Sequence, residues 1–138
     1  MPVFFYFEKT RFRLPHPIKT SNWIILVIRK EGFRLSYLNV VFCNDDFLLS
    51  LNRKYLKHQT LTDILTFDYG NSGPAIEGEI YISVTRVREN SRMFKTRFDD
   101  ELHRVVIHGV LHLMGYNDKT LAQKAKMRDK EEACLSLR

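Results

Sequence analysis

The sequence predicts an α+β fold: a single domain spanning residues 1–138, in which a four-stranded mixed sheet packs with about five helices. The length of 138 residues suits one domain with a sizeable hydrophobic core. The 44% hydrophobic and 28% charged content is that of an ordinary globular protein. Segments rich in β-forming residues alternate with segments of helical pattern, and no repeat or linker divides the chain.

The first half of the chain predicts the order strand, helix, strand, helix. Residues 3–8 (VFFYFE) are aromatic and suit a strand. The following helix has Pro17 in its first turn and Gly32 just after its end, which are favoured places for these residues. Residues 35–44 (LSYLNVVFCN) are rich in β-formers. The Asn-Asp-Asp cluster at their end can cap the next helix, in which apolar residues recur every three or four positions.

The second half predicts two strands followed by three helices. Residues 63–69 (DILTFDY) and 77–83 (EGEIYIS) are typical of strands, and the second shows the clearest alternation of polar and apolar residues. Thr85 is placed to cap a basic helix. A helix with acidic residues in its first turn then ends at Gly115. Residues 120–135 are dense in Ala, Lys, Gln and Glu, which predicts the last helix.

The charge balance favours a polyanionic partner. The formal net charge is +6, from 22 Lys and Arg against 16 Asp and Glu. On a helix, Arg88, Arg92 and Lys95 would share one face, which we expect to border the functional cleft and to bind phosphates. A solvated helix face is the alternative interpretation of these three residues.

Nothing in the sequence suggests a membrane or secreted protein. The longest apolar run, residues 23–28, is far shorter than the roughly 20 residues that span a bilayer. The N-terminal residues show no signal-peptide pattern, so we expect a cytoplasmic location and no membrane partner. Cys43 and Cys134 are far apart and outside any metal-binding spacing, so both are expected to be reduced packing residues.

The segment HGVLHLMGYND, residues 108–118, predicts a metal site. His108 and His112 are four residues apart on a predicted helix, so their imidazoles lie on one face. Gly115 can adopt the left-handed conformation that turns the chain back, which makes Asp118 the expected third ligand. Two histidines and a carboxylate, with a fourth position open, are typical of a catalytic zinc site.

The same segment departs from the zinc peptidases at one catalytic position. The spacing matches the zincin pattern H-E-x-x-H-x-x-G-x-x-H, except that Asp118 replaces the third histidine and Gly109 replaces the glutamate. That glutamate is the acid–base residue of peptide hydrolysis. The sequence therefore argues against a peptidase.

The segment also resembles the signature H-G-x-L-H-L-x-G-Y-D-H of the YbeY family. Residues 51–67 (LNRKYLKHQTLTDILTF) are similar to a second block of that family, L-N-x-x-Y-R-x-x-D-x-P-T-D-V-L-S-F, and EGEIYIS resembles its G-D-I strand. The resemblance implies a bacterial metal-dependent endoribonuclease of the single-strand type, with zinc or another divalent metal. It implies ribosomal RNA, or the small ribosomal subunit, as partner, in ribosomal RNA maturation and ribosome quality control.

Two departures from the family pattern bear on the chemistry of the site. Asp118 stands where the family has a third metal-binding histidine, and a carboxylate can also bind zinc. Leu56 stands where the family has a basic residue thought to help RNA cleavage. Neighbouring basic residues could supply that charge: Arg53, Lys54, Lys57 and His58. We favour His58 as a catalytic residue, because it can titrate near neutral pH.

Residues one turn and one heptad before His108 are further candidates. Glu101 and Arg104 are expected on the side of the helix that carries the histidine pair, where either could orient a ligand or contact substrate. We take Glu101 as the second catalytic candidate. His103 lies about 140° around the helix and is excluded from the metal ligands.

Three classes of function remain from the sequence. A metal-dependent endoribonuclease accounts for the open metal site, the missing glutamate and the basic helix together. A non-catalytic RNA- or ribosome-binding module with a structural metal is the runner-up, and a peptidase accounts for the metal alone.

Overall fold

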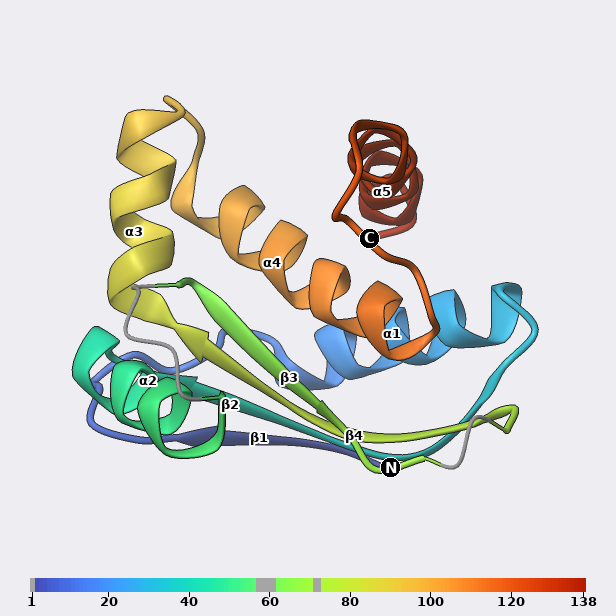
Figure 1. Cartoon of the computed structure of the whole chain (residues 1–138), viewed down its shortest axis with the longest axis horizontal. Coiled ribbons are helices and arrows are strands. Elements are labelled where there is room, and N and C mark those ends of the chain that lie inside the picture. Colours follow the sequence, from blue (N-terminus) through green and yellow to red (C-terminus); the bar gives the residue numbers. More distant parts are fainter. Residues whose placement is uncertain (1, 57–61, 71–72) are drawn as a thin grey trace.

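The computed structural model describes residues 2–56, 62–70 and 73–138, and its elements follow the predicted order (Figure 1). The strands are β1 (Val3–Phe7), β2 (Arg34–Cys43), β3 (Ile64–Asp68) and β4 (Ala75–Ser83). The helices are α1 (Pro17–Lys30), α2 (Asp45–Leu51), the π-helical turn η1 (Asn52–Leu56), α3 (Val84–Met93), α4 (Phe98–Leu113) and α5 (Leu121–Leu135). In this part of the chain no helix is long and apolar enough to cross a bilayer.

The strands form one mixed sheet, as predicted, in the order β1-β2-β4-β3. Strands β1, β2 and β4 run parallel, and β3 pairs antiparallel with β4 at the sheet edge. In the sheet centre Val40 pairs with both Phe5 and Ile80. This arrangement leaves β3 as the edge strand beside α4, where the candidate site lies.

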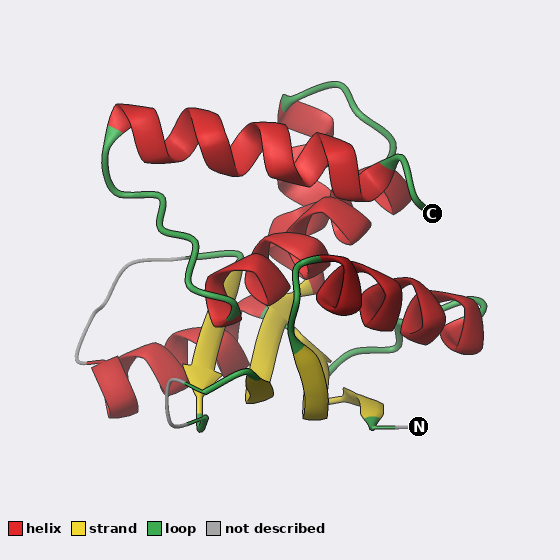
Figure 2. Cartoon of the chain, turned by 90° about the vertical axis from the view of Figure 1, so that its right-hand side faces the viewer, coloured by secondary structure: helices red, strands yellow, loops and turns green. Residues whose placement is uncertain are grey.

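The alternation of buried and partly buried side chains along β4 shows which face of the sheet the helices cover. Ile80 and Ile82 are fully buried beneath the helices, whereas Glu79 and Tyr81 alternate with them and are only partly buried. Helices α1 and α4 lie over the apolar face, and α5 lies over α4 (Figure 1). Figure 2 shows the same layers from the side, with α5 outermost. The main core therefore lies between the sheet and α1 and α4.

A smaller apolar cluster lies on the other face of the sheet. Cys43, Leu48 and Leu65 are buried there, with Phe67 packed against them from β3. The ring of Tyr55 packs edge-on against Phe67, with ring centroids 5.9 Å apart. This cluster fixes α2 and η1 against the sheet.

The basic helix α3 starts and ends differently from the prediction. Ser83, not Thr85, is its N-cap, because Ser83 is the last residue of β4 and its hydroxyl accepts a hydrogen bond from Arg86 N. The helix ends at Met93 because Lys95 adopts a left-handed conformation with φ 56°. Lys95 N and Thr96 N then bond back to helix carbonyls in a Schellman motif, so Lys95 lies beyond the helix.

The end of α4 confirms the predicted turn. Gly115 has φ 100°, in the left-handed region that glycine adopts readily. Gly115 N donates to His112 O at 3.0 Å, and Tyr116 N donates to Leu111 O at 3.1 Å. These two bonds form a Schellman motif that stops the helix and turns the chain toward Asp118.

Candidate metal centre

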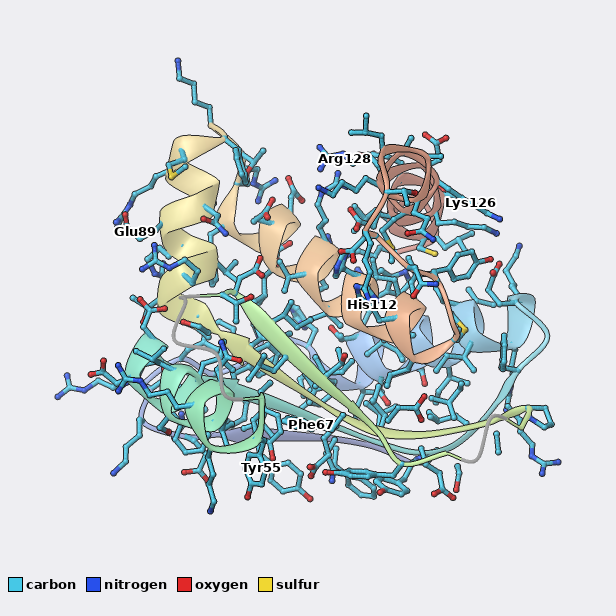
Figure 3. All side chains as sticks on the ribbon, viewed as in Figure 1. Tyr55, Phe67, Glu89, His112, Lys126 and Arg128 are labelled. Carbon is cyan, nitrogen blue, oxygen red and sulfur yellow. The ribbon has the colours of Figure 1, made fainter. Side chains whose placement is uncertain are left out.

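His108 and His112 lie one turn apart on α4, on the side that faces α5 (Figure 3). The turn at Gly115 brings Asp118 to the same place. The Nε2 atoms of the two histidines are 3.0 Å apart, and Asp118 Oδ2 lies 3.3 Å from that of His108 and 3.4 Å from that of His112. The three residues predicted as metal ligands are therefore brought together.

These distances suit a single divalent ion. A ligand sphere of about 2.0–2.1 Å around a tetrahedral ion gives ligand-to-ligand distances of about 3.3 Å. The three side chains are partly buried, with 22%, 26% and 37% of their surfaces exposed for His108, His112 and Asp118. Three electron-rich atoms that converge this closely repel one another unless a proton or a cation lies between them. His108, His112 and Asp118 thus form a candidate metal site.

Glu131 of α5 holds the other side of the His108 ring. Its Oε2 lies 2.6 Å from His108 Nδ1. Arg104, one turn before His108 on α4, donates from Nη1 to the other oxygen of Glu131 at 3.0 Å, and also binds Glu132. Glu131 is only 5% exposed. Side chains of α4, rather than water, therefore bind both oxygens of its carboxylate.

This buried pair has pKa values shifted in opposite directions. Burial alone would raise the pKa of the Glu131 carboxyl, but the hydrogen bonds from His108 and Arg104 hold that pKa below its usual value. Burial alone would lower the pKa of His108, but its hydrogen bond to Glu131 and the negative charge there raise that pKa above its usual value. Glu131 is therefore charged near neutral pH.

A cleft of about 290 Å³ is lined by two of the three ligands, His108 and Asp118. Asp63, directly before β3, lines it together with Glu101 and Arg104 of α4. Burial raises the pKa of the Asp63 carboxyl and that of the Glu101 carboxyl. The cleft thus places two carboxyl groups suited to proton transfer next to the candidate metal ligands.

The other predicted site residues are distributed unevenly. Glu101 lies in the cleft, whereas His58 lies outside the described residues. The basic residues Arg88, Arg92 and Lys95 are exposed but are not among the residues that line the cleft. They belong to α3 and the turn after it, and Glu89 of α3 lies far from His112 in Figure 3.

The basic residues have partners of their own. The guanidinium of Arg88 lies 4.2 Å from the centre of the Phe98 ring. Arg92 forms a 2.8 Å ion pair with Glu89, although both side chains are largely exposed. Neither contact prevents these cations from meeting a phosphate, because each leaves the charge at the surface.

Residues set aside from the metal site lie elsewhere in the core. His103 Nδ1 is 2.7 Å from Asp99 O, and its ring packs beside Trp23. Cys43 and Cys134 are both free and buried. Burial raises the pKa of the Cys43 thiol to about 12, so it stays protonated. The exclusion of His103 and the assignment of the cysteines to packing are confirmed.

Sequence reasoning missed the roles of Glu131 and Asp63. Glu131 lies on the buried face of α5, one turn after Met127 and one turn before Cys134. A carboxylate in the middle of that seven-residue apolar spacing was the signal of a buried, paired charge. Asp63 lies in the segment LTDILTF, and only the family resemblance of that segment indicated that it could belong to the site.

Comparisons with known proteins agree with this geometry. A family model described as Endoribonuclease YbeY matches residues 16–137. Proteins described as endoribonuclease YbeY from Flavobacterium psychrophilum and Amoebophilus asiaticus are 50% and 48% identical to this chain, over 91% and 94% of it and over 89% and 88% of their own lengths. A solution structure of a Thermotoga maritima protein, 27% identical, has a TM-score of 0.70 and covers 96% of this chain and 87% of that one. The chain belongs to the YbeY family.

Proposed function

We propose that this protein is a metal-dependent endoribonuclease that cleaves ribosomal RNA in the cytoplasm, in the maturation and quality control of ribosomes. The proposal rests on the convergence of His108, His112 and Asp118. Two of these ligands, His108 and Asp118, line a cleft that also holds the carboxyl groups of Asp63 and Glu101. The YbeY family membership of the chain supports RNA as the substrate.

The donor set favours zinc, although other divalent metals could bind. Two imidazole nitrogens and one carboxylate oxygen, with a fourth position open, are the ligands of many catalytic zinc sites. A bound divalent ion would supply positive charge beside the scissile phosphate and lower the pKa of a water molecule.

The chain's own groups then move protons and hold the substrate. We assign proton transfer to Glu101, because its buried carboxyl has a raised pKa and lines the cleft. His58 is the second candidate, on the sequence argument alone. Arg88, Arg92 and Lys95 are assigned to the RNA backbone outside the cleft, because phosphate contacts need not lie at the cleavage point.

The test of function compares three substrates and three forms of the protein. Wild type, His112→Ala and chelator-treated wild type are incubated with ribosomal RNA, intact ribosomes and casein. We expect cleavage of RNA by wild type alone and no cleavage of casein. Equal RNA cleavage by His112→Ala would reveal a contaminating nuclease, and metal-dependent casein cleavage without RNA cleavage would make the protein a peptidase. Tight ribosome binding with no cleavage of any substrate would instead support a binding module with a structural metal.

A separate variant tests the role of Glu101. Glu101→Gln should lower the RNA cleavage rate by about 10²- to 10⁴-fold, the usual contribution of an acid–base residue, and should leave metal content unchanged. Asp63→Asn, which changes the other carboxyl group that lines the cleft, shows whether Asp63 carries the proton instead. Full activity of Glu101→Gln would remove Glu101 from the reaction.

A further inference from the structure

We propose that Glu131 is a positioning residue that holds the proton of His108 on Nδ1 and so presents an unprotonated Nε2 to the metal. Arg104 holds Glu131 in place. The inference deepens the proposed function, because it rests on His108 as a metal ligand.

The contact between Glu131 and His108 fixes where the imidazole proton lies. An ionised carboxylate has no proton to donate, so the hydrogen in the 2.6 Å contact belongs to His108 Nδ1. A neutral imidazole carries one proton, which leaves Nε2 with a free lone pair. That Nε2 is the atom that lies 3.0 Å from His112 Nε2 and 3.3 Å from Asp118 Oδ2.

Glu131 is itself held so that it cannot turn away. Its Oε1 accepts the hydrogen bond from Arg104, and its Oε2 accepts the one from His108. Its side chain is 7% exposed and that of Arg104 is 17% exposed. Because both oxygens are engaged by residues one turn apart on α4, the carboxylate is locked relative to the helix that carries the metal ligand.

The position of Glu131 in α5 explains how the contact is maintained. Met127 and Cys134 pack into the core on either side of it, one turn before and one turn after. The packing of α5 over α4 therefore places the Glu131 carboxylate next to His108. Loss of the carboxylate would free the ring to place its proton on Nε2, which then could not bind a metal ion without losing that proton.

The chain offers a matched control in the neighbouring residue. Glu132 also binds Arg104, but its side chain is 58% exposed and it has no contact with His108. Glu132→Gln therefore removes one negative charge and one partner of Arg104 without touching the imidazole. Glu131→Gln removes the same charge from the residue that contacts the imidazole of His108.

The experiment measures zinc affinity by competition with a chromophoric chelator, on metal-stripped protein. Glu131→Gln and Glu131→Ala should bind zinc about 10- to 100-fold more weakly than wild type, the usual effect of losing a carboxylate behind a ligating histidine. Glu132→Gln should bind as wild type does. Wild-type affinity in both Glu131 variants, or an equal loss in Glu132→Gln, would overturn the proposal.

A second measurement needs no variant to fold. In ¹⁵N NMR spectra of the imidazole rings of metal-free wild type, at a pH where the histidines are neutral, His108 should carry its proton on Nδ1. A proton found on Nε2 would overturn the proposal. No RNA enters either measurement, so a protein that behaves as expected here but cleaves no RNA would contradict the proposed function alone.

Discussion

Among single residues, Gly109 occupies the position at which the zinc peptidases carry their glutamate, and packing explains the glycine. A Cβ atom at this position would lie 2.8 Å from Ile64 Cδ1 and 3.0 Å from Ile80 Cδ1. Gly109 therefore faces the sheet, and its lack of a side chain lets α4 approach β3 and β4 closely. A glutamate in its place would have to displace core residues.

We therefore predict that Gly109→Ala destabilises the protein. Overpacking a core typically costs about 1–3 kcal/mol, of which the better helix propensity of alanine returns about 1 kcal/mol. Urea unfolding measures the difference, with Gly73→Ala as control because a Cβ at Gly73 meets nothing within 4 Å. Gly109→Ala protein as stable as wild type, or more stable, would show that the helix adjusts freely. Gly109→Glu should gain no casein cleavage.

The buried His103 predicts a pH dependence of stability. Burial lowers its pKa, so the folded state binds a proton less readily than the unfolded state does. The stability that the neutral ring contributes is fully present above the unfolded pKa of about 6.5 and is lost as pH falls through it toward the folded pKa. In urea unfolding of metal-free protein, the stability advantage of wild type over His103→Gln should shrink as pH falls from about 7.5 to about 5. An advantage that stays constant with pH would contradict this account.

At the scale of elements, α3 and the turn after it present cations away from the cleft. Arg88 and Arg92 lie on the helix, and Lys95 follows it in a left-handed conformation. Replacing all three by alanine should weaken RNA binding about equally across sequences. The slope of log affinity against log salt should fall by up to about 0.7 for each lost contact with a single strand.

The control for this prediction is a second basic group of equal charge. Arg29 and Lys30 at the end of α1, with Arg34 at the start of β2, are exposed and far from α3 (Figure 1). Their triple alanine variant should bind RNA as wild type does, and neither variant should change metal content. If the α3 variant bound RNA as tightly as wild type at every salt concentration, these residues would be an ordinary solvated surface.

The elements were predictable wherever local pattern determines them. The alternation in residues 77–83 predicted β4, and Gly115 predicted the end of α4, because both are decided by neighbours in sequence. The predictions that Thr85 caps α3 and that Lys95 belongs to this helix were wrong, also for a local reason. Ser83, at the end of β4, could cap α3 earlier, and the left-handed conformation of Lys95 is one that a non-glycine residue adopts rarely.

At the scale of the whole molecule, the candidate site joins three segments. The metal ligands come from α4 and the turn after it, Asp63 from the residue directly before edge strand β3, and Glu131 from α5. The ligands were predictable because they fall within eleven residues of one helix and turn. Glu131 is 23 residues from His108, and only the packing of α5 over α4 brings the two together. Local pattern does not specify that packing.

We propose that RNA cleavage requires one metal ion held by His108, His112 and Asp118. Metal-stripped protein is titrated with zinc while RNA cleavage is followed in the same sample. We expect that cleavage is absent at first and rises to a plateau at one equivalent, and that His112→Ala shows neither tight binding nor cleavage. Cleavage at the full rate in the stripped protein, or a plateau that His112→Ala also reaches at one equivalent, would contradict it.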